Sequence, residues 1–112
     1  MHLVAELSGI ARSCLHDSAL LGGLLIAAAG AAGLHAMSTP VLRTTDSRGV
    51  DGLLMLDGGH AAVHAHSDRG TLLVDLLTPA PAELARALDV FTRRLSPTNV
   101  SAERIIRVAA VP

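Results

Sequence analysis

Three histidines in one short segment are the residues of this chain best suited to chemistry. His60, His64 and His66 are separated by even numbers of residues, so their side chains would share one face of a β-strand. Asp57 and Asp68 stand just outside the two ends of this segment. Imidazole and carboxylate groups together are suited to acid–base catalysis, and the same groups bind zinc or non-haem iron.

The spacing of these histidines limits a metal site. His60 and His64 would stand about 13 Å apart along a strand, which is too far for both to bind one ion. His64 and His66 would stand about 6.6 Å apart, so this pair could share one. Two good ligands alone do not make a site, and we therefore predict no metal. His60 and His64 remain candidate catalytic residues.

Composition excludes several classes of function. The chain has 112 residues, half of them hydrophobic, which suits one domain with one modest core. All nine basic residues are arginine, so no lysine can form a Schiff base on this chain. The net charge of −1 and the absence of a basic stripe argue against a nucleic-acid partner. Cys14 is the only cysteine, which favours a reducing compartment, and we expect the cytoplasm.

Residues 18–37 form a run without any charged side chain, long enough to be a formal transmembrane candidate. Its high glycine and alanine content, the presence of His35 and the lack of flanking Lys or Arg favour a buried helix and no membrane partner. Gly23, Ala27 and Ala31 make a row of small residues on this helix, which would allow close packing in an oligomer.

Patterns of alternation, helical spacing and turn residues predict the remaining elements. The order is strand, helix, several strands, helix and strand. This order favours an α+β fold, a two-layer sandwich of a mainly antiparallel sheet with two helices on one face, built as a single domain over 1–112. The expected strands are 2–8, 35–42, 50–56, 60–66, 71–77 and 100–108, with helices from about 18 to 33 and from about 79 to 96 and a polar loop at 43–49.

Four short segments resemble the prokaryotic S-adenosylmethionine decarboxylases in order and spacing. They are HLVAEL at 2–7, GVDG at 49–52, HAAVH at 60–64 and VDLLT at 74–78. The resemblance implies the sandwich fold, a role in polyamine (spermidine) biosynthesis, and a homodimer or higher oligomer with active sites near a subunit interface. In that family a Glu–Ser bond cleaves itself, and the serine becomes a pyruvoyl cofactor that binds the substrate amine and accepts electrons during decarboxylation.

The chain departs from the family at the positions that make this cofactor. By spacing, the Glu–Ser pair falls on Gly58 and Gly59, and glycine has no hydroxyl to attack the preceding carbonyl. A serine that helps processing falls on Asp51. The cysteine that donates a proton falls on Pro79, which has neither a thiol nor an N–H. We therefore expect no pyruvoyl cofactor.

At other positions of the family pattern, this chain has either the same type of residue or a different one. The processing histidine corresponds to His64, and the acid that holds the ribose hydroxyls corresponds to Asp68. The aromatic residue that stacks on adenine falls near Thr45. The resemblance thus implies a member of the family that cannot self-process and that binds an S-adenosylmethionine-like molecule through Asp68 and Thr45. Such a member would serve as a ligand-binding or partner subunit, and an active paralogue is one candidate partner.

Two alternatives stay open at this point. One is a repurposed enzyme that uses the cluster of His60, His64, His66 and Asp68 for acid–base or metal chemistry. The other is a structural oligomer that binds no ligand. The sequence does not name the ligand, because the residues that would reveal it are the ones replaced.

Overall fold

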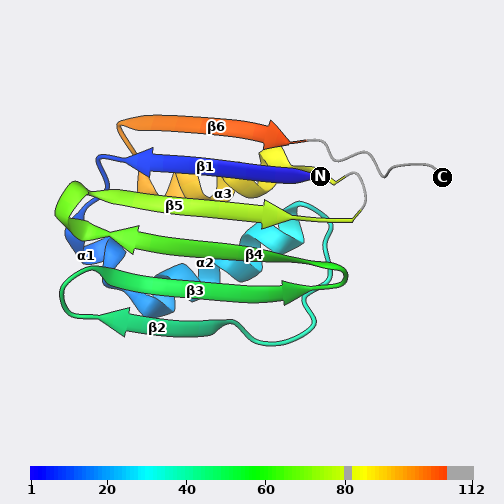
Figure 1. The fold of residues 1–112 in the computed structure, drawn as a ribbon, viewed down its shortest axis with the longest axis horizontal. Helices are drawn as coiled ribbons and strands as arrows, with labels where there is room; N and C mark the ends of the chain where they lie inside the picture. Colours follow the sequence, from blue (N-terminus) through cyan, green and yellow to red (C-terminus); the bar gives the residue numbers. More distant parts are fainter. Residues whose placement is uncertain (80–81, 106–112) are drawn as a thin grey trace.

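A computed structural model describes residues 1–79 and 82–105. These residues form one antiparallel sheet of six strands, and two main helices cover one of its faces (Figure 1). The strand order is β2-β3-β4-β5-β1-β6. This confirms the expected two-layer α+β sandwich. The elements are β1 (His2–Ser8), α1 (Arg12–Leu15), α2 (Ser18–Ala31), β2 (Val41–Thr45), β3 (Gly49–Leu56), β4 (Gly59–His66), the 3-10 turn η1 (Ser67–Arg69), β5 (Thr71–Leu77), α3 (Leu84–Leu95) and β6 (Asn99–Ile105).

The core lies between the sheet and helices α2 and α3. Along each central strand the residues that face the helices are buried, and those between them are more exposed. In α3 the buried residues are Leu84, Ala87, Phe91 and Leu95, and Leu88 is only partly buried. The largest fully buried side chains include Phe91, Leu21, Leu25, Leu54 and Val63.

Helix α2 begins and ends as its sequence predicts. Asp17 caps its start, because the carboxylate accepts a hydrogen bond of 3.0 Å from the backbone N–H of Leu20. Gly33 follows its end with φ of +76°, a conformation that suits glycine. No helix in residues 1–79 or 82–105 is long and apolar enough to cross a membrane. One side of α2 is buried, while Gly23 and Ala27 are exposed on the other.

The second strand was predicted wrongly. The expectation was 35–42, but β2 spans Val41–Thr45, and Ala36 makes only an isolated bridge to Leu56. Proline cannot donate a hydrogen bond to a β-ladder, so regular pairing with β3 starts after Pro40. Much of the predicted polar loop is therefore strand.

Two predicted boundaries also differ. Helix α3 begins at Leu84, so Pro79 lies ahead of the helix instead of in its first turn. Strand β6 runs over Asn99–Ile105, and the predicted positions 106–108 lie outside the described residues.

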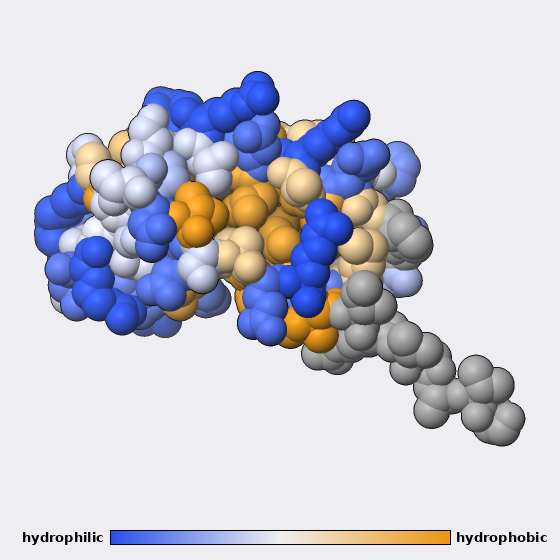
Figure 2. Space-filling model, turned by 90° about the horizontal axis from the view of Figure 1, so that it is seen from above, coloured by the Kyte–Doolittle hydropathy of each residue, from blue (hydrophilic) through white to orange (hydrophobic). Residues whose placement is uncertain are grey.

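Seen from the β6 edge, apolar surface lies between rims of hydrophilic side chains (Figure 2). Val100 and Ile105 are the large hydrophobic side chains of β6 that are exposed, by 40% and 39%.

Candidate functional site

The three histidines of β4 lie on the sheet face that the helices leave open. His60, His64 and His66 alternate with residues that are buried against the helices, so they share one face as predicted. The partners of His60 and His64 are nevertheless different, because His60 meets a side chain of β5 and His64 meets one of β3.

His64 is held by a carboxylate that an arginine fixes in turn. Its Nδ1 lies 2.8 Å from Asp51 Oδ1, and the two residues are paired across β4 and β3. Arg48 Nη1 donates to the same Asp51 oxygen at 2.7 Å and to the carbonyl oxygen of Ala65 at 2.8 Å, while its Nη2 donates to Asp51 Oδ2. We call Arg48, Asp51 and His64 the relay.

The turn between β2 and β3 positions the arginine of the relay. The hydroxyl of Thr45 accepts hydrogen bonds from the backbone N–H groups of Arg48 and Gly49, each at 3.3 Å, and donates to the carbonyl oxygen of Gly49 at 3.2 Å. Thr45, predicted as a ligand-binding residue, thus holds a turn in this structure.

The electrostatics of the relay fix the direction of its hydrogen bonds. The hydrogen bond from Arg48 is the largest cause that lowers the pKa of Asp51, to about 2, and the hydrogen bond to His64 lowers it further. Asp51 is therefore ionised near neutral pH and accepts from the Nδ1–H of His64. The Nε2 atom of His64 has no hydrogen-bond partner within the described residues, and the side chain is 51% exposed.

A second cluster surrounds Asp75 on β5. His2 Nε2 lies 2.6 Å from Asp75 Oδ1, and His60 Nε2 lies 3.4 Å from the same oxygen. The Nδ1 atom of His2 is buried without a hydrogen-bond partner among the described residues. His60 thus meets Asp75, and the predicted acidic neighbour Asp57 lies in an exposed turn instead.

The predicted cluster of His60, His64, His66 and Asp68 does not form one site. Asp68 is exposed in η1, and neither it nor His66 lines the hollows beside His64. Within residues 1–79 and 82–105 no three His, Cys, Asp or Glu side chains come together in a way that could hold a metal ion.

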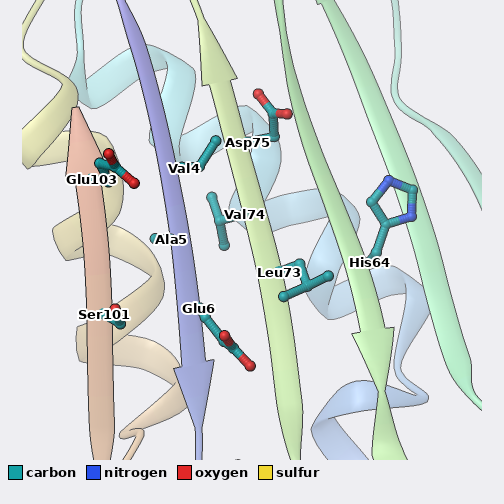
Figure 3. Close-up of a pocket in the computed structure, with 9 residues that line it drawn as sticks. All are labelled: Val4, Ala5, Glu6, His64, Leu73, Val74, Asp75, Ser101 and Glu103. Carbon is teal, nitrogen blue, oxygen red and sulfur yellow. The ribbon is translucent and has the colours of Figure 1, made fainter. Parts of the chain in front are cut away.

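Two hollows on the open face meet at His64. The larger, of about 380 Å³, spreads over β6, β1, β5 and β4, and Figure 3 shows three carboxylates standing around its apolar Val4 and Leu73. The smaller, of about 220 Å³, lies over β2, β3 and β4. The larger is lined by Val4, Ala5, Glu6, His64, Leu73, Val74, Asp75, Ser101 and Glu103, and the smaller by Val41, Arg43, Asp51, Gly52, Leu53, Ala62 and His64.

The two hollows differ in charge, because carboxylates line the larger one, whereas the smaller one has Arg43 beside Asp51, which Arg48 pairs. Glu6 and Glu103 in the larger hollow, and Arg43 in the smaller, form no ion pair with any described residue. The pairing registers place Arg43, Asp51 and His64 side by side across β2, β3 and β4 and continue through Leu73 to Glu6. One row of side chains thus runs from a cation, past the imidazole, to an anion.

Sequence reasoning missed Asp75, His2, Glu6 and Glu103. Asp75 and Glu6 interrupt hydrophobic strands at positions that face away from the core, and this alternation was a usable signal. Which of these residues meet each other depends on the strand order, in which β1 lies between β5 and β6.

The glycine turn before β4 is closed by the end of β5. A Cβ at Gly59 would stand 2.0 Å from the carbonyl oxygen of Leu77, where no side chain fits without a backbone shift. Gly58 has φ of +78°, and a Cβ there would stand 2.9 Å from Pro79 Cγ. A pyruvoyl group would have to form from residue 59 itself, and these residues do not fit one.

Comparison with known proteins agrees with this architecture. The sequence model of the S-adenosylmethionine decarboxylase family matches residues 1–108. The chain is 28% identical over 107 residues to S-adenosylmethionine decarboxylase proenzyme 2 of Bacillus anthracis, covering 95% of this chain and 86% of that protein. The proenzyme 2 of Bacillus cereus is 26% identical over the same length and coverage. The crystal structure of the adenosylmethionine decarboxylase from Aquifex aeolicus VF5 is similar with a TM-score of 0.80 at 22% identity, covering 99% of this chain and 95% of that one.

Proposed function

Because the chain belongs to the S-adenosylmethionine decarboxylase family, we propose that it is a member that neither cleaves itself nor decarboxylates, and that it binds an S-adenosylmethionine-like molecule. The observation that carries this proposal is the turn at Gly58 and Gly59. Residue 59 has no hydroxyl to attack the preceding carbonyl, and the carbonyl of Leu77 occupies the space that a side chain would need. Pro79 likewise offers no proton donor where the family has a thiol.

The charge of the two hollows supports a ligand with separated charges. Carboxylates of Glu6 and Glu103 suit an ammonium or sulfonium group, and the guanidinium of Arg43 suits a carboxylate. S-adenosylmethionine carries both kinds of group, so it could lie across the row with its cationic part in the larger hollow. Asp68 and Thr45, the expected ligand residues, line neither hollow, so the proposed site moves to the row.

The open face also supports a homodimer. Val41, Leu53 and Met55 lie on it with 66%, 38% and 49% of their surface exposed. Sheets that pack face to face bury such side chains between layers about 10 Å apart. A two-fold axis parallel to the strands would bring β2 of one copy over β6 of the other, so that Arg43 would face Ser101 of the second copy, which lies in the same row across the sheet. The ligand site would then lie at a subunit interface.

A second copy is the partner we propose, and an active paralogue with the same open face is the alternative partner. We also place the protein in the cytoplasm, a reducing compartment that suits a chain whose only cysteine is Cys14.

A second candidate function is acid–base catalysis at His64. It rests on one specific observation, the hydrogen bond between Nδ1 of His64 and Asp51.

Intact-mass spectrometry and calorimetry test the proposal. We expect one species of uncleaved mass, no release of carbon dioxide from S-adenosylmethionine, and saturable heat when S-adenosylmethionine is titrated into the protein. Two fragments with a pyruvoyl terminus would overturn the non-processing part. An absence of saturable heat would overturn the ligand-binding part and leave a structural oligomer.

A further inference from the structure

We propose that the relay of Arg48, Asp51 and His64 is a general-base centre that hydrolyses a small carboxylic ester whose acyl group lies in the smaller hollow. Arg43 and His64 also belong to the row proposed for S-adenosylmethionine, so the ester and that ligand would compete for these two residues. The proposed hydrolysis uses a histidine that the loss of self-cleavage leaves without a task, since there is no serine for His64 to assist at position 59.

The geometry of the relay is that of an oriented base. Asp51 accepts from Nδ1–H of His64 at 2.8 Å, which leaves Nε2 as the ring nitrogen with a free lone pair. Arg48 holds both oxygens of Asp51, and its further bond to the Ala65 carbonyl ties the arrangement to the backbone of β4. Because the carboxylate is fixed on two sides, the imidazole keeps one tautomer and one direction.

The smaller hollow supplies the chemistry that an ester needs. Its walls include the side chains of Val41, Leu53 and Ala62, which suit an apolar acyl chain, and its volume of about 220 Å³ restricts that chain to a short one. Arg43 lies in the same row as Asp51 and His64 and pairs with no described carboxylate. Its guanidinium N–H groups can stabilise an oxyanion.

The reaction balances with water as the only co-reactant. His64 Nε2 takes a proton from a water molecule while the water oxygen bonds to the ester carbonyl carbon, and Arg43 stabilises the resulting oxyanion. The carbonyl then re-forms, the bond to the alcohol oxygen breaks, and that oxygen takes the proton from Nε2. Carboxylic acid and alcohol leave, and His64 returns to its neutral form. An ester suits this centre because an alcohol is a better leaving group than an amine.

The test measures hydrolysis of p-nitrophenyl butyrate by the full chain between pH 5 and 9. We expect a rate that saturates with ester concentration and rises with pH, because only the neutral imidazole can accept a proton at Nε2. His64→Asn keeps an amide N–H near the Nδ1 position for Asp51 but removes Nε2, and it should lower kcat/KM by about 10²–10⁴-fold.

Matched controls separate the relay from reactive surface histidines. His66→Gln changes a histidine of the same strand and face that lines neither hollow, and it should leave kcat/KM unchanged within about two-fold. Asp51→Asn should lower kcat and shift the pH profile, while Arg43→Gln should lower kcat without shifting it. Hydrolysis that is linear in ester concentration, or equal in wild type and His64→Asn, would overturn the proposal.

An NMR measurement on the unmutated protein keeps the proposal testable if a variant does not fold. The ¹⁵N shifts of His64 should report protonated Nδ1 and unprotonated Nε2 above pH 8. The opposite tautomer would overturn the proposal, because Nε2 would then carry a proton instead of accepting one. None of these results depends on the calorimetry with S-adenosylmethionine, so the two proposals fail separately.

Discussion

His64 and Asp51 face each other in register across β4 and β3, with 2.8 Å between Nδ1 and Oδ1. In the family that the chain resembles, the position of Asp51 carries a serine. This chain has an anion at that position instead of a neutral hydroxyl, and Arg48 fixes the anion from the preceding turn.

The first prediction concerns acid stability. Because the folded-state pKa of Asp51 is lowered to about 2, Asp51 stabilises the fold above its unfolded pKa of about 4, and this stabilisation is lost as pH falls toward 2. Solvent screening at a partly exposed pair reduces the contribution to about 1 kcal/mol. Urea unfolding should find Asp51→Asn weaker than wild type at pH 7 and nearly equal to it at pH 2. A constant difference at both pH values would contradict the assignment.

The second prediction concerns the glycine turn. Gly59→Ser restores a hydroxyl, yet it should not restore cleavage, because the new Cβ meets the Leu77 carbonyl oxygen. It should lower the free energy of unfolding by about 1–3 kcal/mol, as overpacking does. Gly23→Ser is the matched control, since a Cβ there meets nothing within 4 Å. Mass spectrometry that finds fragments of Gly59→Ser would refute the prediction.

The third prediction concerns the core. Phe91 is a fully buried residue of α3 and is the only Phe, Tyr or Trp of the chain. Phe91→Ala should cost about 3–5 kcal/mol of unfolding free energy, because it leaves a cavity that Leu and Ala neighbours fill only in part. Met37→Ala, at a side chain that is 64% exposed, should change it by less than about 0.5 kcal/mol. Equal effects in urea unfolding would show that the core lies elsewhere.

The fourth prediction concerns assembly. Leu53→Glu puts a charge in the middle of the open face and should convert the proposed dimer to monomer in sedimentation-velocity experiments. Ile26→Glu changes a half-exposed residue of α2 on the opposite side of the molecule and should leave the dimer intact. Dissociation by Ile26→Glu instead of Leu53→Glu would assign the interface to the small-residue side of α2.

The sequence predicted the bounds of the strands better than it predicted which side chains from different strands meet. Alternation placed the bounds of β1 and β5 correctly and put His60 and His64 on one face, because those properties depend on local periodicity. It paired His60 with Asp57, whereas the folded chain pairs it with Asp75. That contact requires β5 to lie beside β4, and strand order depends on long-range pairing that periodicity does not encode. The error at β2 has a local origin instead, because Pro40 cannot donate to the ladder and pairing with β3 starts after it.

The contact of Gly58 with Pro79, and of Gly59 with Leu77, has a consequence for how this chain can evolve. A single mutation to serine at position 59 would strain the turn before it could offer any reaction, and a larger residue at 58 would meet the proline ring. On the proposed function, a route to a self-cleaving turn therefore needs changes in two segments at once, with a less stable intermediate between them.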